Sequence, residues 1–423
     1  MNQFSTSEAE LLLATHKPFS CSAMETSARP YPQVVKYMGS KASLLSFIAS
    51  GINQLNPSKK TLVDLFAGAA AISGGFGHSN RIVSNDIQTY SATIASIYLR
   101  RATRIGNFDI TALAEKTVQA LLAELPTGLS YDGTHASLEY FNDVEAANRA
   151  LLNRNFTSSH HLFTRAYSGT WWSAEQCVWI DAIRKVLDEL IHEEKIGQAD
   201  FDFGLTCLLH AMAYTSQGTG HYAQYRDAKT MQSMADILKY RLASVQSIFD
   251  RKFKTLLKWN HEMVVDLGHE ISSMDYRDRL QSVDNAIIYA DPPYAFVHYS
   301  RFYHAMETLV KYDYPELQHA RGEIVKGRYR SDRHQSPFCI RTQVNAAFEQ
   351  MFDLIRVNRN ELVLSYSNTG MIDINDLIAL AAKSFGPGYQ IASMEFDHQH
   401  MTMGRAADRS RAVRESLILA RRI

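Results

Sequence analysis

The sequence is poor in cysteine and has no excess of charge of either sign. Its 423 residues include only 4 cysteines, and 44 lysines and arginines balance 44 aspartates and glutamates. The cysteines (Cys21, Cys177, Cys207 and Cys339) are scattered without CxxC spacing. This disfavours a zinc or disulfide framework and predicts a reducing, cytoplasmic location. The zero net charge argues against a protein that coats nucleic acid by bulk charge, but it permits a local basic groove.

Signals for membranes and metals are also missing. No apolar stretch is long enough to span a membrane, and the 16 histidines form no HExxH pair. The first residues carry Glu8 and Glu10 instead of a basic segment and an apolar core, so we expect no signal peptide. Because 46% of the residues are hydrophobic, the sequence predicts a globular protein of two or more domains without a metal site.

The most informative stretch, Tyr-Ala-Asp-Pro-Pro-Tyr, directly follows the apolar run 283–288. An exocyclic amine on an aromatic base is a weak nucleophile, because its lone pair is delocalised into the ring. Asp291 and the carbonyl of Pro292 can accept the two N–H bonds of such an amine, and Pro293 helps to fix that carbonyl. Tyr294 offers a flat face on which a base can stack. The alternative is a strand followed by a proline-rich turn without chemical function.

A second pattern predicts a site for a nucleotide-like cofactor. The segment 61–66 is typical of a buried parallel strand, and Gly68 in the following turn lets the backbone approach a ligand closely. A second strand, 81–84, is followed by Asp86, which is placed to bind ribose hydroxyls. The GxGxxG pattern is absent, so a dinucleotide is not favoured. Together these features indicate the start of a doubly wound α/β sheet.

Sheet signals bracket a long helical middle segment. Further strands are expected at 255–259, 286–290 and 362–366, and helices at 180–190, 203–214 and 230–249. We therefore divide the chain into a loose N-terminal extension, a cofactor-binding half, a helical insertion and a catalytic half, at 1–30, 31–104, 105–254 and 255–423.

Four motifs stand in an order that carries a family resemblance. They are 36–41 (KYMGSK), 64–68 (DLFAG), 85–86 (ND) and 291–294 (DPPY). The chain resembles Dam-type (alpha-class) N6-adenine DNA methyltransferases, and the segments 299–308 and 365–370 resemble methylases of restriction–modification systems. The departure is Ala70, where the FxGxG motif of the family usually has glycine. The resemblance implies a Rossmann-like methyltransferase sheet with a mostly helical inserted target-recognition domain.

The same resemblance implies S-adenosylmethionine as cofactor and assigns roles by position. Tyr37 and Lys41 should approach its methionine part, Phe66 and Gly68 should line its pocket, and Asp86 should bind its ribose. Asp291 should touch both the cofactor and the target amine.

One assignment remains a choice between two acids. The family has an acid after the strand that precedes the catalytic motif, near the cofactor adenine. Glu262 and Asp266 compete for this role, and we prefer Glu262.

The expected partner is duplex DNA. A base inside a duplex cannot reach such a pocket, so we expect it to be flipped out and stacked on Tyr294. Candidates for DNA contact in the insertion are the segment 163–172 and three further residues, Tyr222, Tyr225 and Arg226. Candidates for holding phosphates are Arg328, Arg330 and Arg333. The alternatives are helix-packing core for the aromatic residues and a solvated face for the arginines.

The implied function is site-specific adenine methylation in a restriction–modification or related defence or epigenetic system, with a cognate nuclease as a candidate partner. The DPPY motif also suits an RNA adenine, a cytosine N4 amine or a protein glutamine. Glutamine methylases usually have Asn in place of Asp291, and cytosine enzymes more often have Ser there. A DNA-binding module that has lost catalysis is disfavoured, because every chemical position is intact.

Overall fold

The computed structural model describes residues 26–55, 60–131, 137–218, 220–293, 298–401 and 410–423. Tyr294 and most of the expected N-terminal extension lie outside these ranges. In the part of the chain that is described, no helix has the length and apolar character needed to cross a membrane.

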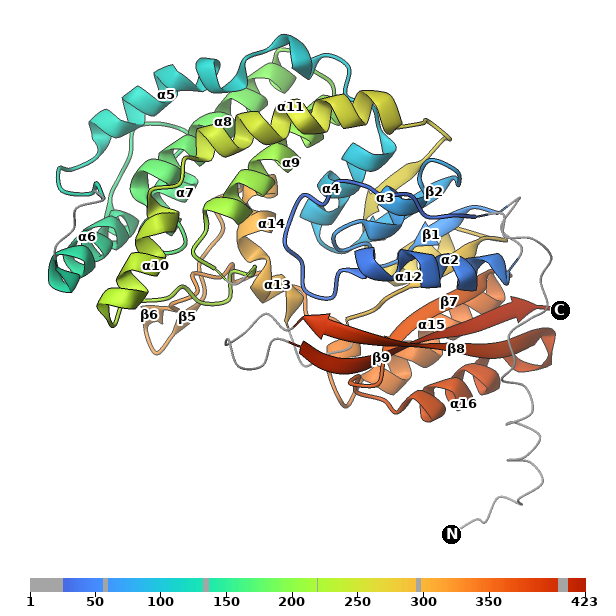
Figure 1. Ribbon diagram of the computed structural model, residues 1–423. Coiled ribbons are helices and arrows are strands. Elements are labelled where there is room, and N and C mark those ends of the chain that lie inside the picture. Colours follow the sequence, from blue (N-terminus) through green and yellow to red (C-terminus); the bar gives the residue numbers. More distant parts are fainter. Residues whose placement is uncertain (1–25, 56–59, 132–136, 219, 294–297, 402–409) are drawn as a thin grey trace.

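A seven-stranded sheet forms the centre of the molecule, in the order β3-β2-β1-β4-β7-β9-β8 (Figure 1). The strands are β1 (Leu62–Asp64), β2 (Ile82–Asp86), β3 (Glu270–Ser273), β4 (Ile287–Ala290), β7 (Glu361–Ser367), β8 (Tyr389–Met401) and β9 (Ser410–Arg422). The first five in this order pair in parallel, whereas β9 pairs antiparallel with both β7 and β8. The mainly parallel α/β sheet expected from the sequence is therefore confirmed.

Helices cover both faces of the sheet. Successive residues of a strand point to opposite faces, so Leu62 packs in one core and Val63 in the other. The first face is covered by α2 (Leu45–Asn53), α3 (Ala71–Phe76) and α4 (Thr89–Leu99), and the second by α12 (Tyr276–Gln281), α15 (Val344–Val357) and α16 (Ile374–Phe385). Because the buried strands are apolar on both faces, they read as continuous apolar runs in the sequence.

A group of helices lies between β2 and β3 in the chain and to one side of the sheet in Figure 1. It contains α5 (Ile110–Glu124), α6 (Leu138–Ala150), α7 (Leu162–Tyr167), α8 (Ala174–His192), α9 (Gln198–Thr215), α10 (Met231–Arg241) and α11 (Val245–Met263). The segment 163–172 belongs to its aromatic core, because Phe163, Trp171 and Trp172 are completely buried. The core-packing interpretation of this segment therefore fits the structure better than DNA contact.

Two short helices and a small hairpin connect β4 to α15. They are α13 (Tyr299–Phe302), α14 (His304–Lys311), β5 (His319–Ala320) and β6 (Glu323–Ile324). Helix α14 packs against both α4 and α9, so this connection touches the sheet half and the helical group at once.

The prediction of a strand at 255–259 is wrong, because these residues lie within α11. Its buried positions are Val245, Phe249, Leu256 and Asn260, and their spacing is that of one helix face. The strand that precedes β4 is instead β3, whose polar residues are exposed or half-buried and give no apolar run. The expected helix at 230–249 is divided in two, since Ser244 caps the N-terminus of α11 by accepting a bond from the Ser247 amide.

Candidate active site

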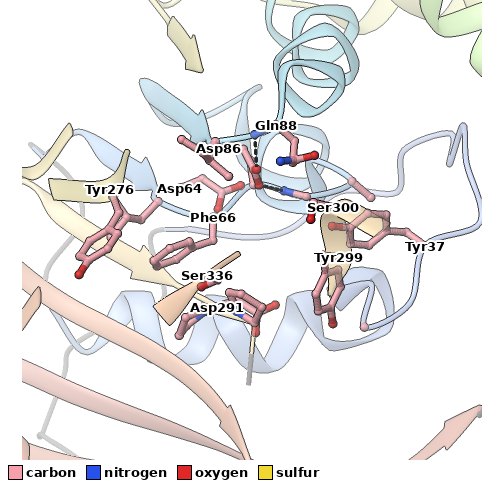
Figure 2. Close-up of a pocket in the computed structure, with 18 of the residues that line it drawn as sticks. Tyr37, Asp64, Phe66, Asp86, Gln88, Tyr276, Asp291, Tyr299, Ser300 and Ser336 are labelled. Atoms are coloured by element: carbon pink, nitrogen blue, oxygen red, sulfur yellow. Dashed lines mark hydrogen bonds between the residues drawn. The ribbon is translucent and has the colours of Figure 1, made fainter. Parts of the chain in front are cut away.

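A pocket opens at the carboxyl ends of β1, β2 and β4 (Figure 2). Strand β1 lies between β2 and β4. The chain runs outward from β1 through β2 to β3 and then crosses back to β4, so the direction of winding reverses between β1 and β4. Ligands of open α/β sheets bind in the crevice at such a point. Eight of the residues selected from the sequence line this one pocket: Tyr37, Lys41, Phe66, Gly68, Asp86, Asp291, Pro292 and Pro293.

The turn after β1 is shaped for close approach. Gly68 has a φ of 51°, and a Cβ added there would lie only 3.0 Å from the Tyr37 ring. Ala70 also adopts the left-handed region, with φ 58° and ψ 40°. Glycine adopts this conformation without strain, which explains why the FxGxG pattern has glycine at this position. Alanine adopts it at some cost in strain.

Asp86 holds the turn against the end of β2. Its Oδ2 accepts a hydrogen bond from the Gly68 amide and its Oδ1 accepts one from the Gln88 amide, each at 2.9 Å (Figure 2). Burial raises the pKa of Asp86 to about 6, although these backbone donors work against the rise. Each carboxylate oxygen has a further lone pair with which it can accept a ligand hydroxyl.

Asp291 shares one lysine with a second carboxylate. Lys41 Nζ lies 3.2 Å from Asp291 Oδ1 and donates at 2.7 Å to Glu415 Oε1, which also accepts from Ser365 Oγ at 2.7 Å. Only 17% of the Asp291 side chain is exposed. Burial raises the pKa of Asp291 to about 7; Lys41 works against this rise and Glu415 adds to it.

Asp64 at the end of β1 contributes a third acid to the pocket. Its Oδ2 is buried and has no hydrogen-bond partner in the described part of the chain. Burial raises the pKa of Asp64, and the charges of Asp86 and Asp291 raise it further. A buried oxygen of this kind is costly unless a donor reaches it.

Aromatic rings stand at two ends of the pocket, with Phe66 and Tyr276 at one end and Tyr37 and Tyr299 at the other (Figure 2). The Tyr37 ring stacks on Tyr303 with 4.4 Å between centroids, and the Tyr303 hydroxyl accepts from the Met38 amide at 2.7 Å. The segment 36–41 is thereby fixed over the pocket by the helices that follow β4.

Comparison with known proteins identifies the family. The family of D12 class N6 adenine-specific DNA methyltransferases matches residues 37–359. The chain belongs to this family. The pocket and the mainly parallel sheet are consistent with a methyltransferase fold.

Several restriction–modification proteins are similar to this D12-class chain. It is 24% identical to modification methylase LlaI of Lactococcus lactis subsp. lactis, over 82% of this chain and 49% of that protein. It is 25% identical to the type II methyltransferase M.FokI of Planomicrobium okeanokoites, over 86% of this chain and 49% of that protein. It is 22% identical to the type II methyltransferase M.NlaIII of Neisseria lactamica, over 81% of this chain and 86% of that protein. The chain thus spans about half the length of the first two relatives.

The acid preferred for the cofactor adenine is not in the pocket of this D12-class protein. Glu262 lies on α11, where 58% of its side chain is exposed and Lys258 is 4.0 Å away. Asp266 does not line the pocket either. The acid that follows β3 and lines the pocket is Asp275, which sequence reasoning missed because the polar strand before it was not recognised.

The residues selected for DNA contact divide into buried and exposed groups. Tyr222 is only 3% exposed, and its amide donates to the Phe302 carbonyl at 2.7 Å. Tyr225 is half-buried, with Arg149 at 4.6 Å and Lys326 at 4.8 Å from its ring centroid. Arg226 is exposed and pairs with Asp236 at 2.8 Å.

The arginines selected for phosphate contact also differ from one another. Arg328 is buried and donates to the backbone carbonyls of Ala166 and Arg149. Arg330 is buried and pairs with Asp313 at 2.6 Å. In this conformation neither guanidinium is available to DNA, whereas Arg333 is half-buried and has no acidic partner in the described ranges.

Proposed function

We propose that this protein transfers the methyl group of S-adenosylmethionine to the N6 amine of an adenine in duplex DNA. The observation that carries the proposal is the meeting of Asp291 and Pro292 with the turn of Gly68 and Asp86 in one pocket. A site for an amine and a site for a nucleoside-like cofactor are therefore adjacent.

The residues present fit this cofactor. The turn at Gly68 leaves no room for a side chain, which suits close contact with a ligand, and the unpartnered Asp64 Oδ2 suits the ammonium group of its methionine part. Asp86 would bind the ribose hydroxyls, while Phe66 and Tyr276 would flank the adenine, with Asp275 as the acid beside it. When bound, S-adenosylmethionine supplies an electrophilic methyl group on a sulfonium.

The chain itself positions and polarises the target amine. Ionised Asp291 and the Pro292 carbonyl accept its two N–H bonds and turn its lone pair away from the ring. Lys41 favours the ionised form of Asp291, and Glu415 holds Lys41 in place. Positioning of this kind can supply most of the acceleration.

Access to the pocket requires the adenine to leave the duplex. We assign stacking of the flipped base to Tyr294, and target recognition to the helical group formed by α5–α11. The relatives named above are methylases of type II or modification systems, so a cognate restriction nuclease is the partner we propose.

Methyl transfer from tritium-labelled S-adenosylmethionine tests the function. Duplex DNA, RNA and a protein extract are offered in parallel, and the labelled DNA is digested to nucleosides. We expect label in DNA as N6-methyladenine. Label confined to RNA, protein or N4-methylcytosine would replace this function by one of the alternatives, and Asp291→Ala serves as the inactive control.

A further inference from the structure

Two arginines at the pocket have no carboxylate partner in the described part of the chain. Arg301 follows Ser300 on α13, and Arg333 precedes His334; both of these neighbours line the pocket. Ser300 Oγ donates to the His334 carbonyl at 2.6 Å, which ties the two segments together beside the pocket.

Both guanidinium groups lie against one aromatic ring. The Cζ atoms of Arg301 and Arg333 are 5.8 Å and 5.2 Å from the ring centroid of Tyr329. Arg333 donates only to neutral acceptors, the Arg330 carbonyl at 2.8 Å and Gln318 Oε1 at 2.5 Å. Arg301 Nε is buried without a hydrogen-bond partner among the described residues. Stacking on a ring orients the planar fork of arginine, which matches phosphate geometry.

The surroundings of these arginines are positive. Burial lowers the pKa of His298, and the charges of Arg301 and Arg333 lower it further. The pKa of His221, on the loop after α9, is lowered by burial and by Arg301, and that of Arg333 is lowered by burial and by Arg301. Uncompensated cations that are partly removed from water are costly, so this corner favours an anion supplied from outside.

The neighbouring arginines provide a contrast. Arg330 is neutralised by Asp313 and Asp332, and Arg328 is buried against backbone carbonyls. Arg330 is thus neutralised within the protein and Arg328 is enclosed by it, whereas Arg301 and Arg333 are only half-buried and have no carboxylate partner among the described residues.

We propose that Arg301 and Arg333 bind the phosphodiester backbone of the DNA strand whose base enters the pocket. This inference rests on the proposed function, since it requires DNA as the substrate. Because both guanidinium groups lie over one ring next to the pocket, a short stretch of backbone reaches both. Phosphate contacts fix the register of a protein on DNA without reading its sequence.

The test measures binding of a mixed-sequence DNA duplex by fluorescence anisotropy at several salt concentrations. The variants are Arg301→Gln, Arg333→Gln and the double mutant. Each single change should weaken binding about tenfold and reduce the slope of log K against log salt by about 1. S-adenosylmethionine affinity, measured by calorimetry, should stay unchanged.

The matched control is Arg356→Gln. Arg356 is an exposed arginine near the end of α15, which precedes β7 and so lies at the opposite edge of the sheet; it pairs with Asp353. The Arg356→Gln variant should bind DNA as the wild type does. If the glutamine variants fail to fold, Arg301→Lys and Arg333→Lys keep the charge but lose the fork, and should weaken binding with an unchanged salt slope.

Unchanged affinity and slope in folded Arg301 and Arg333 variants would overturn the inference, as would an equal loss in Arg356→Gln. Binding of inorganic phosphate alone by the wild type, without a loss of DNA affinity in the variants, would also overturn it. If the wild type methylates DNA and the variants behave normally, only this inference fails. If the wild type binds DNA through these arginines but methylates no nucleic acid, the proposed function fails instead.

Discussion

Buried acids at the pocket and in the helical group differ in how many hydrogen-bond donors the protein gives them. In the helical group, Asp181 accepts bonds from the Phe163 amide, from the amide and hydroxyl of Thr164, and from the Tyr312 hydroxyl, at 2.5–2.9 Å. At the pocket, Asp64 has an oxygen without a described partner and Asp291 shares a single lysine with Glu415.

This is the difference we expect between acids that hold the fold together and acids that bind a ligand. An acid whose lone pairs are filled by the protein holds helices together, and nothing remains for a ligand. An acid that is buried but incompletely satisfied destabilises the free protein and gains when a ligand supplies donors. The pocket acids are of the second kind, and the following changes test the distinction.

The largest loss of stability should follow Asp181→Ala. It leaves several buried donors without an acceptor, so we expect the free energy of unfolding to fall by about 3 kcal/mol or more. Urea denaturation measures the change, and cofactor affinity per folded molecule should be unaffected. A variant as stable as the wild type would mean that a buried acid whose oxygens are fully hydrogen-bonded is dispensable for the fold.

Asp86→Ala should instead weaken S-adenosylmethionine binding by about 1.5–3 kcal/mol, because a charged acceptor for the ribose is lost. Calorimetry on the folded variant gives the affinity, with Asp266→Ala, which is outside the pocket, as control. Equal affinities in wild type and Asp86→Ala would contradict the role of Asp86.

Glu415→Gln should shift the pH profile of methylation. Asp291 must be ionised to accept the amine, so kcat/KM should rise with pH through the pKa of about 7 of Asp291 in the free protein. Removing the Glu415 charge removes a cause of the raised pKa, so the acid limb should move to lower pH. Gln still accepts bonds from Lys41 and Ser365; an acid limb that stays in place or moves upward would refute the coupling.

Arg226→Gln should have the smallest effect. Its pair with Asp236 is at the surface, so stability should change by less than about 1 kcal/mol. If the loop after α9 contacts DNA, affinity should fall severalfold and the salt slope by about 1. Binding identical to the wild type at every salt concentration would place DNA contact elsewhere.

The sequence predicts the elements that are apolar or locally encoded. The strands β1, β2, β4 and β7 are expected from their apolar runs, and the turn at Gly68 and the acid Asp86 from their place after a strand. Strand β3 is missed because its residues, Glu-Ile-Ser-Ser, lie at the sheet edge and need no apolar face. Asp275 is consequently not considered, and the choice is made between Glu262 and Asp266.

Long-range pairing is what the sequence cannot specify. Glu415 reaches Lys41 only because the C-terminal hairpin of β8 and β9 joins the sheet beside β7. In the same way, the sequence shows the charges of Arg328, Arg330 and Arg333 but not their partners. Only the structure distinguishes the internally paired Arg330 from Arg333.

The most direct test of the account is single-turnover methylation of duplex DNA by Asp291→Ala, normalised to folded protein by circular dichroism. The folded-state pKa of Asp291 is raised above its usual value, so its ionised form opposes folding at neutral and higher pH. Lys41 keeps its pair with Glu415 when Asp291 is removed, so the change should cost little stability, while methyl transfer should fall at least about a hundredfold. Near-normal turnover in a folded Asp291→Ala variant, or a loss of stability with turnover retained, would contradict the account.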